Sequence, residues 1–172
     1  DYNLNSLREK GYLTRRSDVS RGLQLVEDTR QAPQLETITV PLVGTIAAGE
    51  PISLPSADAE MEINDYESIM LPQSIAASTK RLYALRVKGL SMIDALIDDG
   101  DTVVMKQVHQ VETGQIAAVR LKLEDETTLK RVYIEDSTIR LQPANPHMDP
   151  IHVPANNVEI LSRLIAVWRF LG

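Results

Sequence analysis

The chain has 172 residues, which is enough for one domain of ordinary size together with a fragment of another. Apolar residues make up 43% of it and support a packed core, while the lack of cysteine excludes disulfides, zinc–thiolate sites and thiol catalysis. The net charge of −6 argues against nucleic-acid binding over the whole surface. No apolar run approaches the ~20 residues that span a membrane and no leader opens the chain, so we expect a cytoplasmic protein.

The charge is distributed unevenly along the chain. Residues 4–26 carry five basic and two acidic side chains, a net charge of +3, so the remainder sums to −9. Residues 1–10 predict the end of a helix, and 12–15 and 22–26 predict two strands of a basic hairpin. This order is typical of the C-terminal half of a winged helix-turn-helix domain; a surface hairpin with solvated arginines is the alternative. The candidate DNA-binding residues are Arg15, Arg16 and Arg21.

A polar stretch separates this basic end from the rest. Residues 27–39 contain Pro33 and show no hydrophobic periodicity, which indicates a linker between domains 1–26 and 40–172. A short helix or turn is expected within 66–78. Short strands divided by turn signals predict a mainly β, mostly antiparallel second domain. The predicted strands are 40–46, 81–87, 102–106, 115–123, 127–134, 138–142 and 158–170.

Ser91 lies on a predicted turn directly after the half-buried strand 81–87. Gly89 permits a sharp backbone turn just before this serine. A serine hydroxyl becomes a strong nucleophile only when a neighbouring base removes its proton. The backbone N–H groups of Leu90 and Ser91 are candidates for an oxyanion hole, which needs donors directed at the developing negative oxygen.

Lys130 is the candidate base. In the predicted strand 127–134 it shares a face with Val132 and Ile134, so it points inward if those two residues face the core. A lysine acts as a base only when neutral, and burial lowers its usual pKa of about 10.4. Spacing alone favours the ordinary interpretation, in which a strand lysine extends its ammonium to solvent.

Neither a metal site nor a cofactor is predicted. The three histidines, His109, His147 and His152, are scattered at no metal-ligand spacing and are expected at the surface. The acidic run 94–101 predicts a capped, solvated turn rather than a cation site.

Five segments, in the same order, resemble LexA-type SOS-response repressors, whose S24 self-cleaving domain is shared with UmuD-like proteins and phage repressors. The first helices of that family's DNA-binding domain have no counterpart in this chain, the stretch 53–80 is longer than usual, and Ile93 stands where lysine is common. The matching segments are 7–13 with 20–23 (recognition-helix end and wing), 40–51 (cleavage site), 87–92 (nucleophile turn), 98–101 (acidic turn) and 127–132 (base strand).

The resemblance implies that Ser91 and Lys130 form a catalytic dyad that cleaves the chain's own Ala48–Gly49 bond. Cleavage there would separate the DNA-binding end from the body. The family further implies a homodimer formed through the C-terminal domain, with residues 164–170 as a candidate contact strand or a core strand. It also implies operator DNA as a partner and a RecA filament on single-stranded DNA as the trigger.

Three alternatives remain open. A UmuD-like polymerase accessory protein shares the self-cleaving domain, but the wing-like segment 12–26 argues against it. A self-cleaving phage repressor is weakened by the winged rather than purely helical DNA-binding end. A type I signal peptidase, or another serine–lysine protease acting on other proteins, does not explain the built-in Ala48–Gly49 site.

Overall fold

The computed structural model describes residues 2–10, 12–15, 23–25, 36–47, 66–76 and 81–170. The chain divides into two compact units, Asp1–Leu35 and Glu36–Gly172, and each is considered by itself. Within the described residues, no helix has the length and apolar character that crossing a membrane requires.

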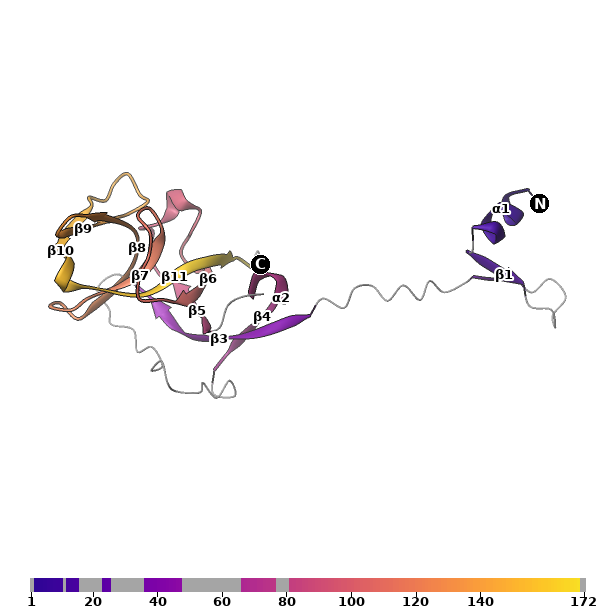
Figure 1. The fold of residues 1–172 in the computed structure, drawn as a ribbon, viewed down its shortest axis with the longest axis horizontal. Coiled ribbons are helices and arrows are strands. Elements are labelled where there is room, and N and C mark those ends of the chain that lie inside the picture. Colours follow the sequence, from indigo (N-terminus) through magenta and orange to yellow (C-terminus); the bar gives the residue numbers. More distant parts are fainter. Residues whose placement is uncertain are drawn as a thin grey trace. The chain divides into compact units, whose positions relative to one another are not determined.

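The first unit contains a helix and a two-stranded antiparallel sheet (Figure 1). Helix α1 (Tyr2–Glu9) precedes strands β1 (Leu13–Arg15) and β2 (Leu23–Leu25), with Leu13 opposite Leu25. The predicted helix and hairpin strands are therefore confirmed. Of the candidate DNA-binding residues, Arg15 ends β1, whereas Arg16 and Arg21 lie outside the described residues.

Nine strands of the second unit's described residues form one sheet in the order β10-β9-β8-β7-β11-β6-β5-β3-β4. Neighbours are antiparallel except for the parallel pair β3–β5, which confirms the mainly β fold. The strands are β3 (Thr37–Ile46), β4 (Ser68–Pro72), β5 (Leu82–Val87), β6 (Thr102–Gln107), β7 (Ile116–Leu121), β8 (Glu126–Glu135), β9 (Thr138–Gln142), β10 (Ile151–Pro154) and β11 (Val158–Trp168); the short helices are α2 (Gln73–Ala76), η2 (Ile93–Ala95) and η3 (Ala155–Asn157).

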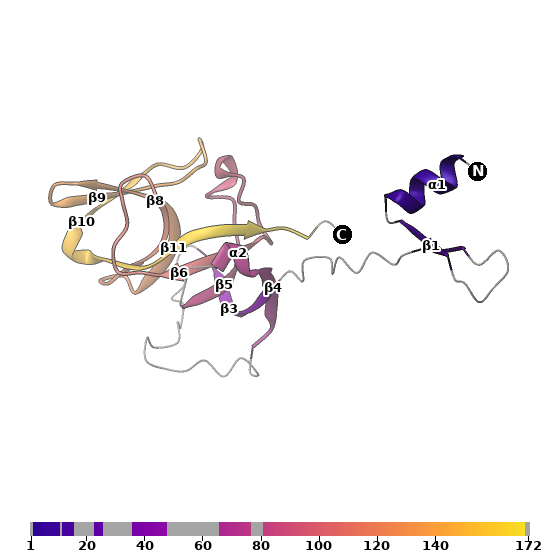
Figure 2. The ribbon, with the colours of Figure 1, turned by 45° about the vertical axis from the view of Figure 1, so that its right-hand side comes forward.

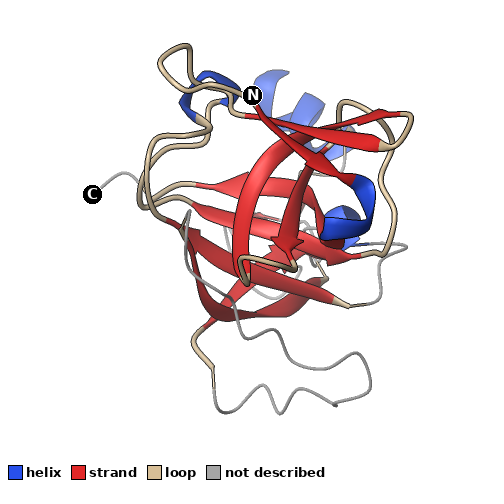
Figure 3. Cartoon of the chain, turned by 90° about the vertical axis from the view of Figure 1, so that its left-hand side faces the viewer, coloured by secondary structure: helices blue, strands red, loops and turns tan. Residues whose placement is uncertain are grey.

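The sheet curls, so its two halves enclose different cores. Strands β7 to β11 curve around one interior, filled from every strand by residues such as Val119, Val132 and Leu141 (Figures 1 and 3). At the other end, helix α2 lies beside β3 and β4 (Figure 2). A second core covers one face of β5 and β6, including Leu85 and Met105, and a third covers their opposite face.

Three of the sequence predictions differ from the structure. Strand β5 is not half-buried, because Leu82 and Ala84 pack into the third core. In β8, Lys130 and Val132 face inward as expected, but Ile134 is exposed because β8 extends past its neighbour β7 there. Strand β3 begins at Thr37 rather than residue 40, because residues 37–39 pair with β4 instead of belonging to the linker.

Two strands and one buried acid were also missed. Strands β4 and β10 are short, lie at the two edges of the sheet and contain prolines, so their sequences carry little alternation. The acidic run is not wholly solvated, because Asp101 is buried and pairs with Arg169.

One buried hydrogen bond links strands that are not neighbours. The hydroxyl of Tyr83 in β5 donates to Ser162 Oγ in β11 at 2.5 Å, across β6. Burial raises the pKa of Tyr83 to about 12, so this hydroxyl stays protonated over the physiological range. The pair satisfies two polar groups that would otherwise lie unpaired in the interior.

Tyr83→Phe should lower the free energy of unfolding by about 1–3 kcal/mol, because it leaves the Ser162 hydroxyl buried without its donor. The double variant Tyr83→Phe/Ser162→Ala should recover most of that loss, since neither hydroxyl remains to be satisfied. Urea unfolding measures both. Equal stabilities for the single and double variants would contradict the assigned hydrogen bond.

Candidate functional site

The turn that carries Ser91 begins where β5 ends. Gly89 adopts φ +99°, a left-handed conformation that side-chain-bearing residues rarely adopt. Its N–H donates to Asp99 Oδ1 at 2.7 Å, which ties the turn to the acidic loop before β6. Met92, directly after the serine, is almost fully buried and anchors the turn in the core. The predicted glycine-assisted turn is therefore present. Ser91 is partly exposed between Gly89, which is bound to Asp99, and the buried Met92.

The acidic loop is itself held by the C-terminal end of the sheet. Arg169, after β11, forms two 2.7 Å hydrogen bonds to the two carboxylate oxygens of Asp101. The hydrogen bonds from Arg169 lower the pKa of this carboxyl, which stays ionised although it is buried. The Asp101 carbonyl accepts from the Val87 N–H at 2.7 Å, so the loop runs alongside the start of the Ser91 turn.

A loop between β9 and β10 holds the other side of the Ser91 turn. Asn145 Nδ2 donates to the carbonyl oxygen of Leu90 at 2.8 Å. The carbonyl of Ala144 accepts from the Asp94 N–H, also at 2.8 Å. The turn is therefore clamped on both sides by segments distant in sequence.

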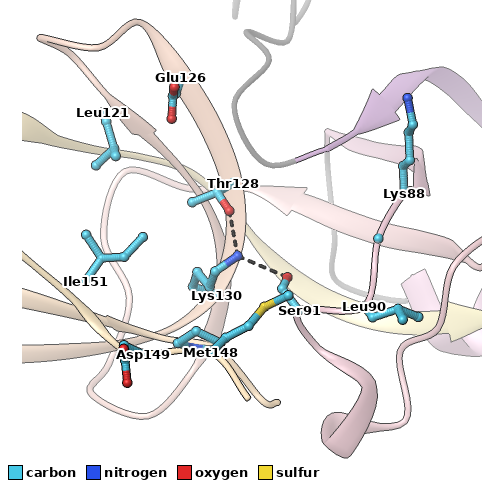
Figure 4. A pocket seen from close by; sticks show the side chains of 12 residues that line it. Lys88, Leu90, Ser91, Leu121, Glu126, Thr128, Lys130, Met148, Asp149 and Ile151 are labelled. Carbon is cyan, nitrogen blue, oxygen red and sulfur yellow. Dashed lines mark hydrogen bonds between the residues drawn. The ribbon is translucent and has the colours of Figure 1, made fainter. Parts of the chain in front are cut away.

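Lys130 reaches Ser91 from the middle of β8. Its ammonium lies 3.0 Å from Ser91 Oγ, 2.7 Å from Thr128 Oγ1 and 3.0 Å from the Leu129 carbonyl oxygen (Figure 4). The residue is only 4% exposed. The structure thus brings together the two residues that the sequence nominated, 39 positions apart, in a geometry suited to proton transfer.

Burial sets the protonation chemistry of Lys130. On the same face of β8 lies Val132, and directly opposite on β7 lies Ala117, both buried and apolar. No carboxylate forms an ion pair with this ammonium among the residues that the structure describes. Burial therefore lowers the pKa of Lys130 to about 8, which gives a substantial neutral fraction at mildly alkaline pH.

The dyad opens onto a cavity. One wall is the Ser91 turn, and the opposite wall is β8 with Thr128 and Lys130. Apolar residues such as Met148 and Ile151 and the charged Lys88, Glu126 and Asp149 complete the lining (Figure 4). The partly exposed serine, the mainly apolar lining and the adjacent lysine suit attack on a carbonyl held in an extended segment. Within the described residues, no group of histidines and acids has the arrangement of a metal site, and the three histidines are exposed.

Strand β3 leads directly to this cavity. It pairs in parallel with β5, with Ile46 opposite Val87, and the Ile46 carbonyl accepts from the Lys88 N–H at 3.0 Å. Ala47, the last described residue of this segment, is buried. The predicted cleavage residues Ala48 and Gly49 follow at once and lie outside the described residues.

Sequence reasoning missed two supporting residues. Thr128 was not singled out, although it lies two residues before Lys130 on the same strand face and this spacing was available as a signal. Asn145 gave no signal of its own, because the Pro143–Pro146 segment indicates only a turn. The N–H groups of Leu90 and Ser91, which are the predicted oxyanion-hole donors, contact no acceptor among the described residues.

Comparisons with known proteins give a consistent result. The family model described as Peptidase S24-like matches residues 41–165, which include both Ser91 and Lys130. The chain is 42% identical to a LexA repressor of Herpetosiphon aurantiacus over 174 residues, covering 99% of this chain and 79% of that protein. LexA repressors of Roseiflexus sp. (42% identity, 98% and 77% coverage) and Bacillus subtilis (37%, 96% and 76%) are also similar.

The buried lysine predicts an unusual pH dependence of stability. Below about pH 8, Lys130 is charged in both folded and unfolded chains, so the full cost of burying the charge applies; between pH 8 and 10.5 only the unfolded chain retains the proton. The free energy of unfolding of Ser91→Ala should therefore rise over this range by about 3 kcal/mol more than that of Ser91→Ala/Lys130→Met. Urea unfolding at several pH values measures the difference, and parallel curves would contradict it.

Proposed function

This chain belongs to the Peptidase S24-like family and is a LexA-type repressor, and we propose that it represses DNA-damage (SOS) genes until it cleaves its own Ala48–Gly49 bond. Ser91 is the nucleophile and Lys130 is the base. The observation that carries this proposal is the 3.0 Å contact between Lys130 Nζ and Ser91 Oγ in an apolar setting.

The dyad performs acyl transfer in two steps. Neutral Lys130 accepts the Ser91 hydroxyl proton while Oγ attacks the carbonyl carbon of Ala48. The resulting oxyanion accepts hydrogen bonds from the N–H groups of Leu90 and Ser91. Collapse breaks the C–N bond, and protonated Lys130 gives its proton to the departing amine of Gly49. Water, activated by Lys130, then hydrolyses the Ala48 ester and regenerates Ser91.

The substrate segment is supplied by the same chain. Strand β3 ends beside the Ser91 turn, so only a short stretch separates Ile46, which pairs with that turn's strand, from the Ala48 carbonyl. Tethering of this kind replaces a bimolecular encounter with an intramolecular one. Ala48 has a small side chain and Gly49 has none, which permits close approach to the serine.

Cleavage at this position acts as a switch. It separates the N-terminal unit, in which Arg15, Arg16 and Arg21 contact operator DNA, from the domain that forms the homodimer. Two half-sites bound by linked units gain affinity from their connection, and that gain disappears when each unit is released. A RecA filament on single-stranded DNA, in the cytoplasm, stimulates the reaction by favouring the cleavable conformation.

The repressor function is favoured over the three alternatives by the extent of the similarity. The relatives named LexA repressor align over 96–99% of this chain, so the match includes the first unit as well as the peptidase domain. A UmuD-like accessory protein or a protease that acts on other proteins has no use for that unit. A self-cleaving phage repressor with a purely helical DNA-binding end does not account for the hairpin of β1 and β2.

Incubation of the purified chain at increasing pH should yield two fragments, 1–48 and 49–172. The rate should rise about tenfold per pH unit and level off above the Lys130 pKa of about 8. Ser91→Ala and Lys130→Ala should each lower it by at least about a thousandfold. Gel electrophoresis and N-terminal sequencing, with Gly49 as the new first residue, provide the measurement.

The matched control is Lys122→Ala, which should cleave at the wild-type rate. Lys122 is exposed, and its ammonium donates to the backbone carbonyl of Asn156. An intact wild type, even with an activated RecA filament, would contradict the proposed self-cleavage.

Arg16→Ala and Arg21→Ala should weaken binding to operator DNA and lower the salt dependence of the binding constant by about one ion per lost phosphate contact. Titration of fluorescent operator DNA at several salt concentrations measures both effects. Arg120→Ala, in the second unit, is the control and should bind like the wild type. Unchanged salt dependence in the first two variants would remove these arginines from the DNA interface.

A further inference from the structure

The turn that carries the nucleophile is oriented by a side chain from outside the cavity. We propose that Asn145 is a positioning residue for self-cleavage: its hydrogen bond to the Leu90 carbonyl fixes the peptide plane whose N–H, on Ser91, stabilises the oxyanion. This inference rests on the proposed function, and it assigns a role to the β9–β10 loop.

A single peptide unit joins the Leu90 carbonyl to the Ser91 N–H. The Leu90 carbonyl and the Ser91 N–H belong to the same planar trans peptide, so they point in nearly opposite directions. Whatever holds the carbonyl oxygen therefore determines where the N–H points. Asn145 Nδ2 holds this oxygen at 2.8 Å, whereas the turn's own bond, from the Ile93 N–H, is long at 3.4 Å.

The backbone donor of Ser91 is available beside the nucleophile. The N–H of Ser91 contacts no acceptor among the described groups, and both Leu90 and Ser91 line the cavity that contains the dyad. A backbone donor left open beside a nucleophile is what a developing oxyanion requires. Because such a donor helps only when it is already oriented, rotation of this peptide would weaken the transition state without displacing the serine.

Asn145 is itself held in place. Its Oδ1 accepts from the His147 N–H at 2.9 Å, which sets the amide so that Nδ2 faces Leu90. The neighbouring Ala144 carbonyl accepts from the Asp94 N–H, a backbone bond that does not depend on the Asn145 side chain. Removing the side-chain amide therefore leaves the loop attached to the Ser91 turn while releasing the Leu90 carbonyl.

The same loop also gives a readout that distinguishes positioning from collapse. Pro143 and Met148, on either side of Asn145, line the cavity beside Lys130. If the loop moved away, water would reach the lysine and its pKa would return toward the ordinary value. The pH midpoint of cleavage therefore reports the integrity of the loop, and the plateau rate reports the oxyanion donor.

The test compares wild type, Asn145→Leu and Asn145→Ala in self-cleavage across pH. Asn145→Leu keeps a branched side chain that cannot form hydrogen bonds, and Asn145→Ala repeats the loss with a smaller side chain. Both should lower the plateau rate by about 10- to 100-fold, somewhat less than deletion of an oxyanion donor itself, with the midpoint unchanged. Asn156→Leu, at an exposed position within η3, is the matched control and should cleave like the wild type.

Each outcome has a definite meaning. A lower plateau with an unchanged midpoint supports the inference. Wild-type plateau rates in both variants would overturn it, as would a rate loss explained by a midpoint shifted to higher pH, because the loop would then act only by excluding water. Failure of the wild type to cleave at any pH would overturn the proposed function and, with it, this inference.

Discussion

The burial of Lys130 is the constraint on which the site depends. Lys130 is only 4% exposed, and its ammonium has no carboxylate partner among the described residues, so burying its charge is costly. Three oxygen acceptors reduce that cost. These acceptors are neutral, so they satisfy the hydrogen-bonding groups without holding the proton as a carboxylate would. That combination lowers the pKa of Lys130 to about 8 and makes the lysine a usable base.

The curled sheet explains how such a lysine can exist. In a flat sheet with one solvated face, a four-carbon side chain would reach water at the edge. Here β8 lies between β7 and β9, and both of its faces are buried: Leu129 on one face, and Thr128, Lys130 and Val132 on the other. Ile134 is exposed because β8 extends past the end of β7 at this point. Only the earlier part of β8 therefore provides the enclosed environment.

The sequence predicted the two residues of the dyad and most of the strands, but not the residues that hold the dyad in place. Ser91 and Lys130 were recognisable because a glycine turn and an inward strand position are local patterns, and the family resemblance linked them. Asn145 and Arg169 act across more than 50 positions, and their contacts depend on how loops meet in space. Strand β10 was missed for a related reason: an edge strand with a proline owes its pairing to β9 rather than to its own alternation.

A self-cleaving repressor must also remain intact while it is needed. Protonation of Lys130 contributes to this by slowing cleavage. With a pKa of about 8, roughly one Lys130 in ten is neutral at pH 7, so the base slows the reaction by about tenfold and cannot by itself keep the chain whole. In our proposal, the larger restraint lies in the approach of the Ala48–Gly49 segment to a Ser91 turn that is already clamped in place. A stimulating partner has most to gain by favouring the docked segment, because the catalytic groups need no rearrangement. In our proposal, regulation acts on the substrate segment, while the fold keeps the chemistry ready.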